Sequence, residues 1–274
     1  MVREERLSYK TILVEESASI KTITLNRPER HNAMTPEMQT ELTCALDEVT
    51  SSGCRVLVLT GAGEAFCSGL DLSALRSTQE KSAADHRMDA ERITRLFISL
   101  YELPVPTIAA VHGAAIAGGA GLAFLCDFTL ATPAAKFGFT EVRIGFVPAL
   151  VSAFLALQIG EKRRRDLLLT GRLFDAEEAH RIGLVSEIMA PEELTQRVQA
   201  LADVLIANSP ESLKATKLLM AAQNSTWLNA AIVEALEANA HSRETADFRE
   251  GITAFLEKRK PVWGKGSRAK PTRQ

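Results

Sequence analysis

Residues 103–127, LPVPTIAAVHGAAIAGGAGLAFLCD, decide the fold class of this chain. The apolar run Thr107–Val111 is long enough for a buried strand, and Gly118–Leu125 continues as an apolar helix. Between them the sequence is almost only glycine and alanine. An oxygen atom can come close to the free N–H groups at the start of such a helix, which suits an oxygen that becomes negative during a reaction. Close packing of helix against strand explains the small residues equally well at this point.

Strands and helices alternate on both sides of this segment. Thr35 is a good N-cap and Pro36 suits the first helical position. The other expected strands are Lys10–Val14, Ile20–Leu25, Arg55–Thr60, Phe128–Thr132 and Lys136–Gly138, and the other expected helices start near Pro36, Lys81, Val147, Lys162 and Ala176. The alternation predicts an α/β core over residues 1–195, and an almost unbroken helical pattern predicts a separate helical region over 196–274.

The composition excludes several classes of protein. Among 274 residues, 32 are Lys or Arg and 34 are Asp or Glu, so a net charge of −2 suggests neither nucleic acid nor a membrane surface as partner. No stretch approaches the roughly 18 apolar residues of a membrane span, and no apolar signal core opens the chain. The four cysteines have no metal spacing and read as buried small hydrophobic residues. We expect a soluble cytoplasmic protein without a metal.

Two further segments could carry chemistry. Glu64–Leu72 follows an expected strand, and ligands of α/β sheets gather beyond the carboxyl ends of strands. Glu141 lies among the apolar residues of Phe137–Pro148, where a carboxylate is expected to have a raised pKa that suits proton transfer. Taken singly, the first segment is an ordinary turn, and the second reads as a salt bridge of Glu141 to Arg143 or a surface turn.

Together these segments resemble the crotonase superfamily, the enoyl-CoA hydratase/isomerase family, over nearly the whole chain. The matching motifs are Leu25–Pro28, His31–Ala33, Ala65–Leu72, Pro106–Gly113, Gly118–Gly119, Cys126–Asp127, Glu141–Gly145, Leu169–Gly171, Gly183–Val185 and Phe255–Arg259. The resemblance implies a spiral of ββα units with a helical C-terminal region. It also implies a homotrimer or a hexamer built as a dimer of trimers.

The resemblance also implies a site. The backbone N–H groups of Leu70 and Gly118 would form an oxyanion hole for the thioester oxygen of an acyl-CoA, with Glu141 as the acid/base. The residues that would contact the CoA are Arg30, His31, Ala33, Leu70, Asp71, Leu72, Ser73, Phe255 and Lys258. CoA would arrive as part of the substrate, and no other cofactor is expected.

One position departs from the family pattern. Hydratases with two carboxylates carry a Glu three residues after the oxyanion glycine, where this chain has Gly121. We expect an enzyme of fatty acid metabolism that hydrates a 2-enoyl-CoA, or dehydrates the product. The alternatives are a Δ3,Δ2-enoyl-CoA isomerase that uses Glu141 alone, and a non-catalytic protein that binds acyl-CoA or RNA. Asp71, His112 and Arg143 could add chemistry, although Asp71 suits turn capping and His112 a core or hinge position better.

The acyl pocket is the last expectation. Phe139, Phe146 and Phe154 could shape an apolar pocket for the acyl group, although most phenylalanines are core residues.

Overall fold

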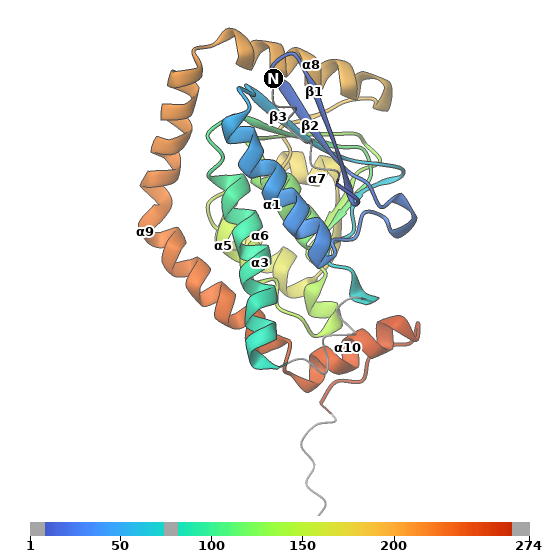
Figure 1. Ribbon diagram of the computed structural model, residues 1–274. Coiled ribbons are helices and arrows are strands. Elements are labelled where there is room, and N and C mark those ends of the chain that lie inside the picture. Colours follow the sequence, from blue (N-terminus) through green and yellow to red (C-terminus); the bar gives the residue numbers. More distant parts are fainter. Residues whose placement is uncertain (1–8, 74–81, 265–274) are drawn as a thin grey trace, which may run out of the picture.

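The computed structural model describes residues 9–73 and 82–264, which form two β-sheets surrounded by helices (Figure 1). The larger sheet has the order β1 (Ile12–Ser17), β2 (Ile20–Leu25), β3 (Val56–Gly61), β5 (Thr107–Val111), β7 (Phe128–Ala131), β10 (Glu187–Ile188). The smaller sheet has the order β4 (Ala65–Cys67), β6 (Ala114–Ile116), β8 (Lys136–Gly138), β9 (Leu173–Asp175). All neighbours pair in parallel except β1 with β2 and β8 with β9.

Successive turns of the chain place one strand in each sheet and then add a helix. The first turn is β3, β4 and α3 (Ala83–Tyr101), the second is β5, β6 and α4 (Gly118–Leu125), and the third is β7, β8 and α5 (Ala149–Leu155). This repetition confirms the predicted α/β spiral of ββα units. Because parallel strands end at one edge of each sheet, successive turns bring their connections together there.

The helices form where the sequence supplies caps and apolar stripes. Thr35 accepts a hydrogen bond from the Met38 N–H at the start of α1 (Pro36–Ser51), as expected of an N-cap. In α3, Ser82 and Asp85 form a capping box. The helix expected from Lys81 is α3, although Lys81 itself lies outside the described residues. The remaining helices of the core are α6 (Glu161–Thr170) and α7 (Ala176–Arg181).

Three-residue strands are the main difference from the sequence-based expectation. The glycine- and alanine-rich stretch after Val111 is more than a turn, because it contains β6. β4 and β9 were not expected either, since three residues are too few to show an alternating pattern; the equally short β8 does lie at its predicted bounds. Cys44 is exposed on α1, so the prediction that all four cysteines are buried is wrong for this one; Cys54, Cys67 and Cys126 are buried.

Three helices after the core pack along its top, one side and its base in the view of Figure 1. They are α8 (Pro191–Ala207), α9 (Pro210–Ser242) and α10 (Ala246–Leu256). The predicted division after residue 195 falls inside α8, whose residues Leu194 and Leu205 pack on the larger sheet. Residues 265–274 of the predicted helical region lie outside the described part. None of the helices found in residues 9–73 and 82–264 is long and apolar enough to span a membrane.

α9 is attached to the core by a partly buried ion pair. Lys217 Nζ lies 2.6 Å from Asp127 Oδ2 and donates to the carbonyl oxygen of Val105 at 2.8 Å. Asp127 also accepts hydrogen bonds from the Thr107 N–H and hydroxyl. The ion pair therefore ties α9 to the start of β5, and from there α9 runs along α3 and α5.

α10 packs directly on η2 (Glu141–Ile144), a 3-10 turn. At Gly251 a Cβ atom would lie 2.2 Å from the carbonyl oxygen of Ile144, and at Gly145 it would lie 2.4 Å from that of Asp247. Gly145 also has a φ of +66°, which favours glycine. Only glycine at both positions lets the two backbones approach this closely.

Candidate active site

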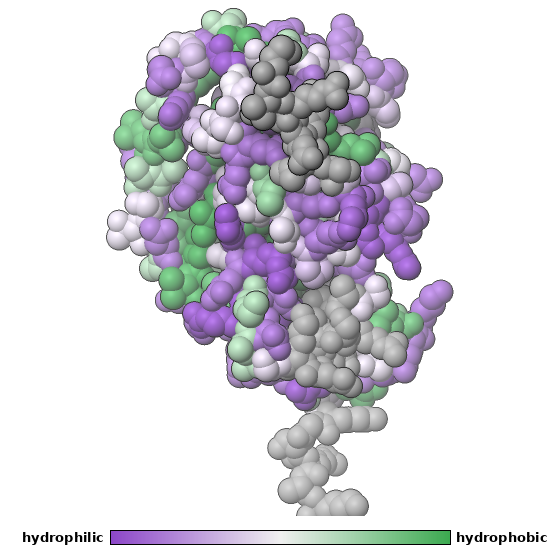
Figure 2. Space-filling view, viewed as in Figure 1, coloured by the Kyte–Doolittle hydropathy of each residue, from purple (hydrophilic) through white to green (hydrophobic). Residues whose placement is uncertain are grey.

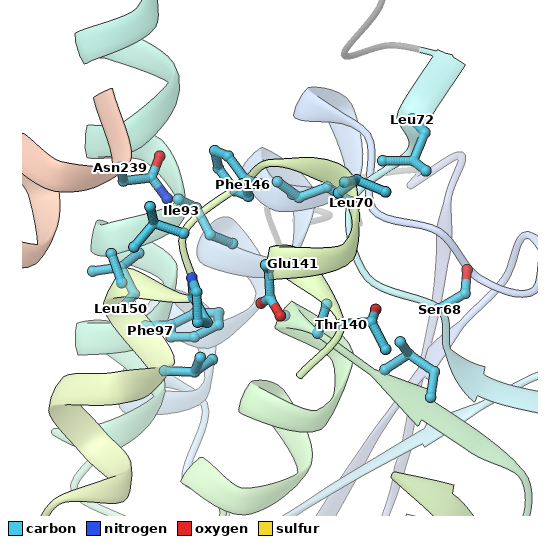
Figure 3. A pocket seen from close by; sticks show the side chains of 18 of the residues that line it. Ser68, Leu70, Leu72, Ile93, Phe97, Thr140, Glu141, Phe146, Leu150 and Asn239 are labelled. Atoms are coloured by element: carbon cyan, nitrogen blue, oxygen red, sulfur yellow. The ribbon is translucent and has the colours of Figure 1, made fainter. Parts of the chain in front are cut away.

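A mostly apolar cavity of about 250 Å³ lies between η2, the start of α4 and the helices α3, α5, α9 and α10. Figure 3 shows Glu141 near its centre, with Ser68 on one side and Asn239 on the other. Its lining comprises Ser68, Leu70, Leu72, Ile93, Phe97, Ile116, Ala117, Gly118, Thr140, Glu141, Ile144, Phe146, Val147, Pro148, Ala149, Leu150, Val151, Asn239 and Phe255. An apolar cavity with few polar groups is typical of a small-molecule site.

The backbone N–H of Leu70 is available at this cavity. Leu70 forms a parallel bridge with Met34, in which the Met34 N–H donates to the Gly69 carbonyl at 2.7 Å and the Asp71 N–H donates to the Met34 carbonyl at 3.0 Å. Successive N–H groups of an extended segment point to opposite sides, so the Leu70 N–H points away from Met34. It has no backbone acceptor within the described residues.

The N–H of Gly118 lies close by. Gly118 is the first residue of α4, where an N–H has no partner within the helix. The preceding Ala117 N–H donates to the Gly138 carbonyl at 2.7 Å, which fixes this end of β6. A Cβ atom at Gly69 would lie 3.7 Å from the Gly118 nitrogen, so the two loops are in contact. Gly69 has a φ of +89°, so the turn before Leu70 favours glycine.

Glu141 supplies the titratable group of the cavity. Its side chain is 8% exposed, and Oε2 has no hydrogen-bond partner in the part of the chain that the structure describes. Burial without a nearby cation disfavours the charged form and raises the pKa of Glu141 to about 7. Figure 3 shows the carboxylate among Leu70, Phe97 and Thr140. A carboxyl group with such a pKa can both accept and donate a proton near neutral pH.

The structure tests the other roles considered for Glu141, Arg143, Asp71 and His112. Arg143 is exposed and forms no ion pair with Glu141, so neither a salt bridge nor a surface turn describes Glu141. Asp71 is buried, lies 3.0 Å from Arg27 and accepts from the Ser73 N–H, which agrees with turn capping. His112 is half-exposed and bonds the Gly63 carbonyl at 2.9 Å, so it connects two loops and is not a core histidine.

The position of the missing carboxylate is filled by apolar side chains. A Cβ atom at Gly121 would lie 2.8 Å from Phe97 and 2.8 Å from Val151. Both side chains line the cavity. They form an apolar wall at the position where the resemblance predicts a Glu in hydratases with two carboxylates. Of the three phenylalanines expected in the acyl pocket, Phe146 lines the cavity. Phe139 and Phe154 pack behind this wall, around Gly121.

The residues expected to contact CoA fall into two groups. Leu70, Leu72 and Phe255 line the cavity, whereas Ala33, Asp71, Ser73 and Lys258 do not. Arg30 and His31 are exposed, and the His31 carbonyl accepts from the N–H of Ser68, a residue of the cavity lining. The backbone of these two residues therefore lies near the side of the cavity opposite Asn239.

Sequence reasoning missed the contributions of α3 and α9. Ile93 and Phe97 belong to the buried stripe of α3, which is indistinguishable from core in the sequence. Asn239 is the one polar residue that α9 gives to the described lining. The sequence could have indicated Asn239, because a polar residue on a buried helix face is unusual.

Comparisons with known proteins agree on one family. The family model for enoyl-CoA hydratase/isomerase matches residues 15–266. A Thermus thermophilus protein, provisionally assigned as an enoyl-CoA hydratase, is 45% identical over 247 residues, covering 90% of this chain and 98% of the relative. An enoyl-CoA hydratase/isomerase structure from Xanthobacter autotrophicus is 30% identical and superposes with a TM-score of 0.85, covering 92% of this chain and 97% of the other. An enoyl-CoA hydratase structure from Mycobacterium avium subsp. paratuberculosis, 26% identical, gives 0.84, with 94% and 100% covered.

Proposed function

Because this chain belongs to the enoyl-CoA hydratase/isomerase family, we propose that it adds water across the Cα–Cβ double bond of a 2-enoyl-CoA, or removes it. One observation carries the proposal: a buried carboxyl group, whose Oε2 has no hydrogen-bond partner among the described residues, shares a cavity with two backbone N–H groups that have no backbone acceptor among them. The thioester needs the N–H groups, and the proton transfer needs the carboxyl group.

The steps follow from these groups. Ionised Glu141 takes a proton from water, the water oxygen bonds to Cβ, and the π electrons move to the thioester oxygen as an enolate. The N–H groups of Leu70 and Gly118 stabilise that oxygen, and one such donor contributes on the order of 3 kcal/mol to the transition state. Glu141 then returns the proton to Cα, which restores the thioester. The CoA enters as part of the substrate, with Arg30 and His31 near its anionic portion.

Isomerisation is the second candidate, and the wall at Gly121 favours it. With Phe97 and Val151 in that space, Glu141 is the only carboxylate of the described lining. A single carboxylate is sufficient to take a proton from Cα of a 3-enoyl-CoA and return it to Cγ. The same two N–H groups would stabilise the enolate between these steps.

Absorbance of the conjugated thioester separates the two reactions. Hydration of crotonyl-CoA removes the conjugated chromophore, whereas isomerisation of a 3-enoyl-CoA creates it. In either case kcat/KM rises about tenfold per pH unit below about 7 and levels above it, because ionised Glu141 is the base. Absence of both reactions, or a rate independent of pH between 5 and 9, would contradict the proposal.

The RNA-binding alternative has less support. Arg164 and Arg165, from the longest basic run, both pair with Glu161 on one face of α6. These ion pairs reduce the positive potential that an RNA backbone would require. A gel shift with single-stranded RNA at modest salt tests this alternative, and we expect no shift.

We also propose that the chain assembles as a homotrimer, or as a hexamer made of two trimers, in the cytoplasm. Figure 2 shows hydrophobic side chains along the edge formed by α9. The exposed large apolar residues of α9 are Leu218, Leu219, Met220, Trp227 and Val233. A partner surface would remove them from water. Light scattering coupled to size-exclusion chromatography measures the assembly, and a monomer at micromolar concentration would contradict it.

A further inference from the structure

Asn239 is a polar residue at the end of the cavity that faces away from the CoA side. Its side chain is 5% exposed, and its closest cavity neighbours in Figure 3 are apolar, with Ile93 and Leu150 nearby. Glu141 lies between Asn239 and Ser68 in this view. Asn239 therefore lies where the distal part of an acyl chain would end when its thioester is at Leu70 and Gly118.

The orientation of the Asn239 amide is fixed by Arg243. The Arg243 Nε–H donates to Asn239 Oδ1 at 3.2 Å. A guanidinium group only donates, so the amide oxygen must face Arg243 and the NH₂ group must face away from it. Figure 3 shows the amide nitrogen on the side of Ile93. Nδ2 has no acceptor in the described part of the chain, which leaves its N–H groups free toward the cavity.

Arg243 itself is held rigidly. It is 3% exposed, and its Cζ lies 5.2 Å from the centre of the Phe146 ring, in a cation–π contact. Burial lowers the pKa of Arg243, and no carboxylate of the described residues lies within ion-pair distance of it. Asp89 attracts it from further away but pairs with Arg92 at 2.9 Å. A buried cation without an ion pair is costly, and here it orients Asn239 and adds positive potential at this end.

We propose that Asn239 is a specificity-determining residue whose Nδ2–H donates to an oxygen at the distal end of the acyl chain. The favoured substrates are then acyl-CoA thioesters that end in a hydroxyl, carbonyl or carboxylate oxygen. A plain alkyl chain would cover this donor without giving it an acceptor, which weakens binding. Arg243 acts as the positioning residue. The inference rests on the proposed function, because the proposed thioester position determines which end of the cavity holds the distal part of the acyl chain.

Binding of saturated thioesters tests the inference without any chemistry. Calorimetry compares pentanoyl-, 5-hydroxypentanoyl- and glutaryl-CoA, followed by the corresponding sets from butanoyl to octanoyl. At the best-fitting length we expect an oxygen-terminated thioester to bind about tenfold more tightly than its alkyl counterpart. Equal preference for hydroxyl and carboxylate indicates recognition by the amide alone, and preference for carboxylate indicates a contribution from the Arg243 charge. Equal or weaker binding of every oxygen-terminated thioester overturns the proposal.

Two variants separate recognition from folding. Asn239→Leu keeps the approximate volume and removes the donor, so the preference for oxygen should disappear while alkyl thioesters still bind. Arg243→Lys keeps the charge but loses the geometry that orients the amide, so the preference measured by calorimetry should shrink about threefold or more. In turnover of the corresponding enoyl thioesters the same loss should appear in KM and not in kcat. Retention of the preference in a folded Asn239→Leu protein, checked by circular dichroism, overturns the assignment.

The outcome stays distinct from that of the proposed function. Selective binding of oxygen-terminated thioesters without conversion of any enoyl-CoA would support the role of Asn239 and contradict the proposed reaction. Turnover of alkyl enoyl-CoA without a preference for oxygen-terminated chains would support the proposed reaction and contradict the role of Asn239. Failure to bind any acyl-CoA overturns both.

Discussion

The two sides of the cavity are built from different parts of the polypeptide. On one side the working groups are backbone N–H groups at Leu70 and Gly118, held by the Met34 bridge and by the β6–β8 ladder. On the other side they are side chains, with Glu141 from η2, Phe97 from α3 and Asn239 from α9. The backbone side suits any thioester, whereas the side-chain side can change without altering the fold. In the proposed reaction, enolate stabilisation therefore depends on the backbone of the fold, and the choice of reaction and substrate depends on a few side chains.

Glu141→Gln gives the sharpest test of the side-chain side. We expect kcat/KM to fall by about 10³-fold, because the proton-transfer group is lost while the N–H groups remain. The assay is the absorbance change of the preferred enoyl-CoA. Glu177→Gln is the matched control, since Glu177 is exposed and outside the cavity, and its rate should equal that of the parent. Comparable rates for Glu141→Gln and the control would remove Glu141 from the mechanism.

Gly69→Ala tests the backbone side. The added Cβ would lie 3.0 Å from both the Ile116 carbonyl oxygen and Ala117 Cβ, so the Leu70 amide must shift. We expect kcat/KM to fall about 10²-fold, since displacements near 1 Å have such effects. Gly53→Ala controls for strain, because Gly53 also has a positive φ, +72°, but nothing within 4 Å of its added Cβ. Similar losses of activity in both variants would show that strain, and not the amide position, is responsible.

The buried state of Glu141 predicts a stability that depends on pH. The pKa of Glu141 is raised in the folded protein, so the folded state holds its proton at pH values where the unfolded chain has released it. The free energy of unfolding therefore falls as pH rises from about 4.5 to about 7, by roughly 3 kcal/mol from this group. Glu141→Gln should remove this contribution. Urea unfolding of both proteins at pH 5 and pH 8 measures it, and parallel pH dependence in both would refute the assignment.

Gly121→Ala tests how firmly the apolar wall is packed. Its methyl group would meet Phe97 and Val151 at 2.8 Å, so we expect a loss of about 1–3 kcal/mol in the free energy of unfolding. Val151→Ala added to this variant should restore part of the loss, as a double-mutant cycle would show. Gly160→Ala is the control, because no atom lies within 4 Å of its added Cβ; since Gly160 is the N-cap of α6, it should cost no more than about 1 kcal/mol. A loss of the same size at Gly160 would mean that the loss at Gly121 does not come from tight packing against Phe97 and Val151.

The difference between the two sides also explains what could be predicted from sequence. β5 and α4 occupy their predicted bounds, because a β-branched apolar run and a glycine-opened apolar helix are local signals. The segments around Leu70, Gly118 and Glu141 are each contiguous in the sequence, so each could be recognised there as a candidate site segment. Asn239 and Phe97 meet only through the packing of α9 on α3, and the strand β6 is too short to carry a period. Which side chains fill the space at Gly121 depends on tertiary packing that no local pattern records.

The backbone contact between α10 and η2 has a consequence for the order in which the protein is synthesised on the ribosome. Translation proceeds from the N-terminus, so every residue from β1 to Ser242 is made before α10 exists. Until α10 emerges and docks, the turn that carries Glu141 lacks the support of Gly251 and Phe248 beneath it. Glu141, the proposed acid/base group, can therefore gain this support only after the rest of the scaffold has been synthesised.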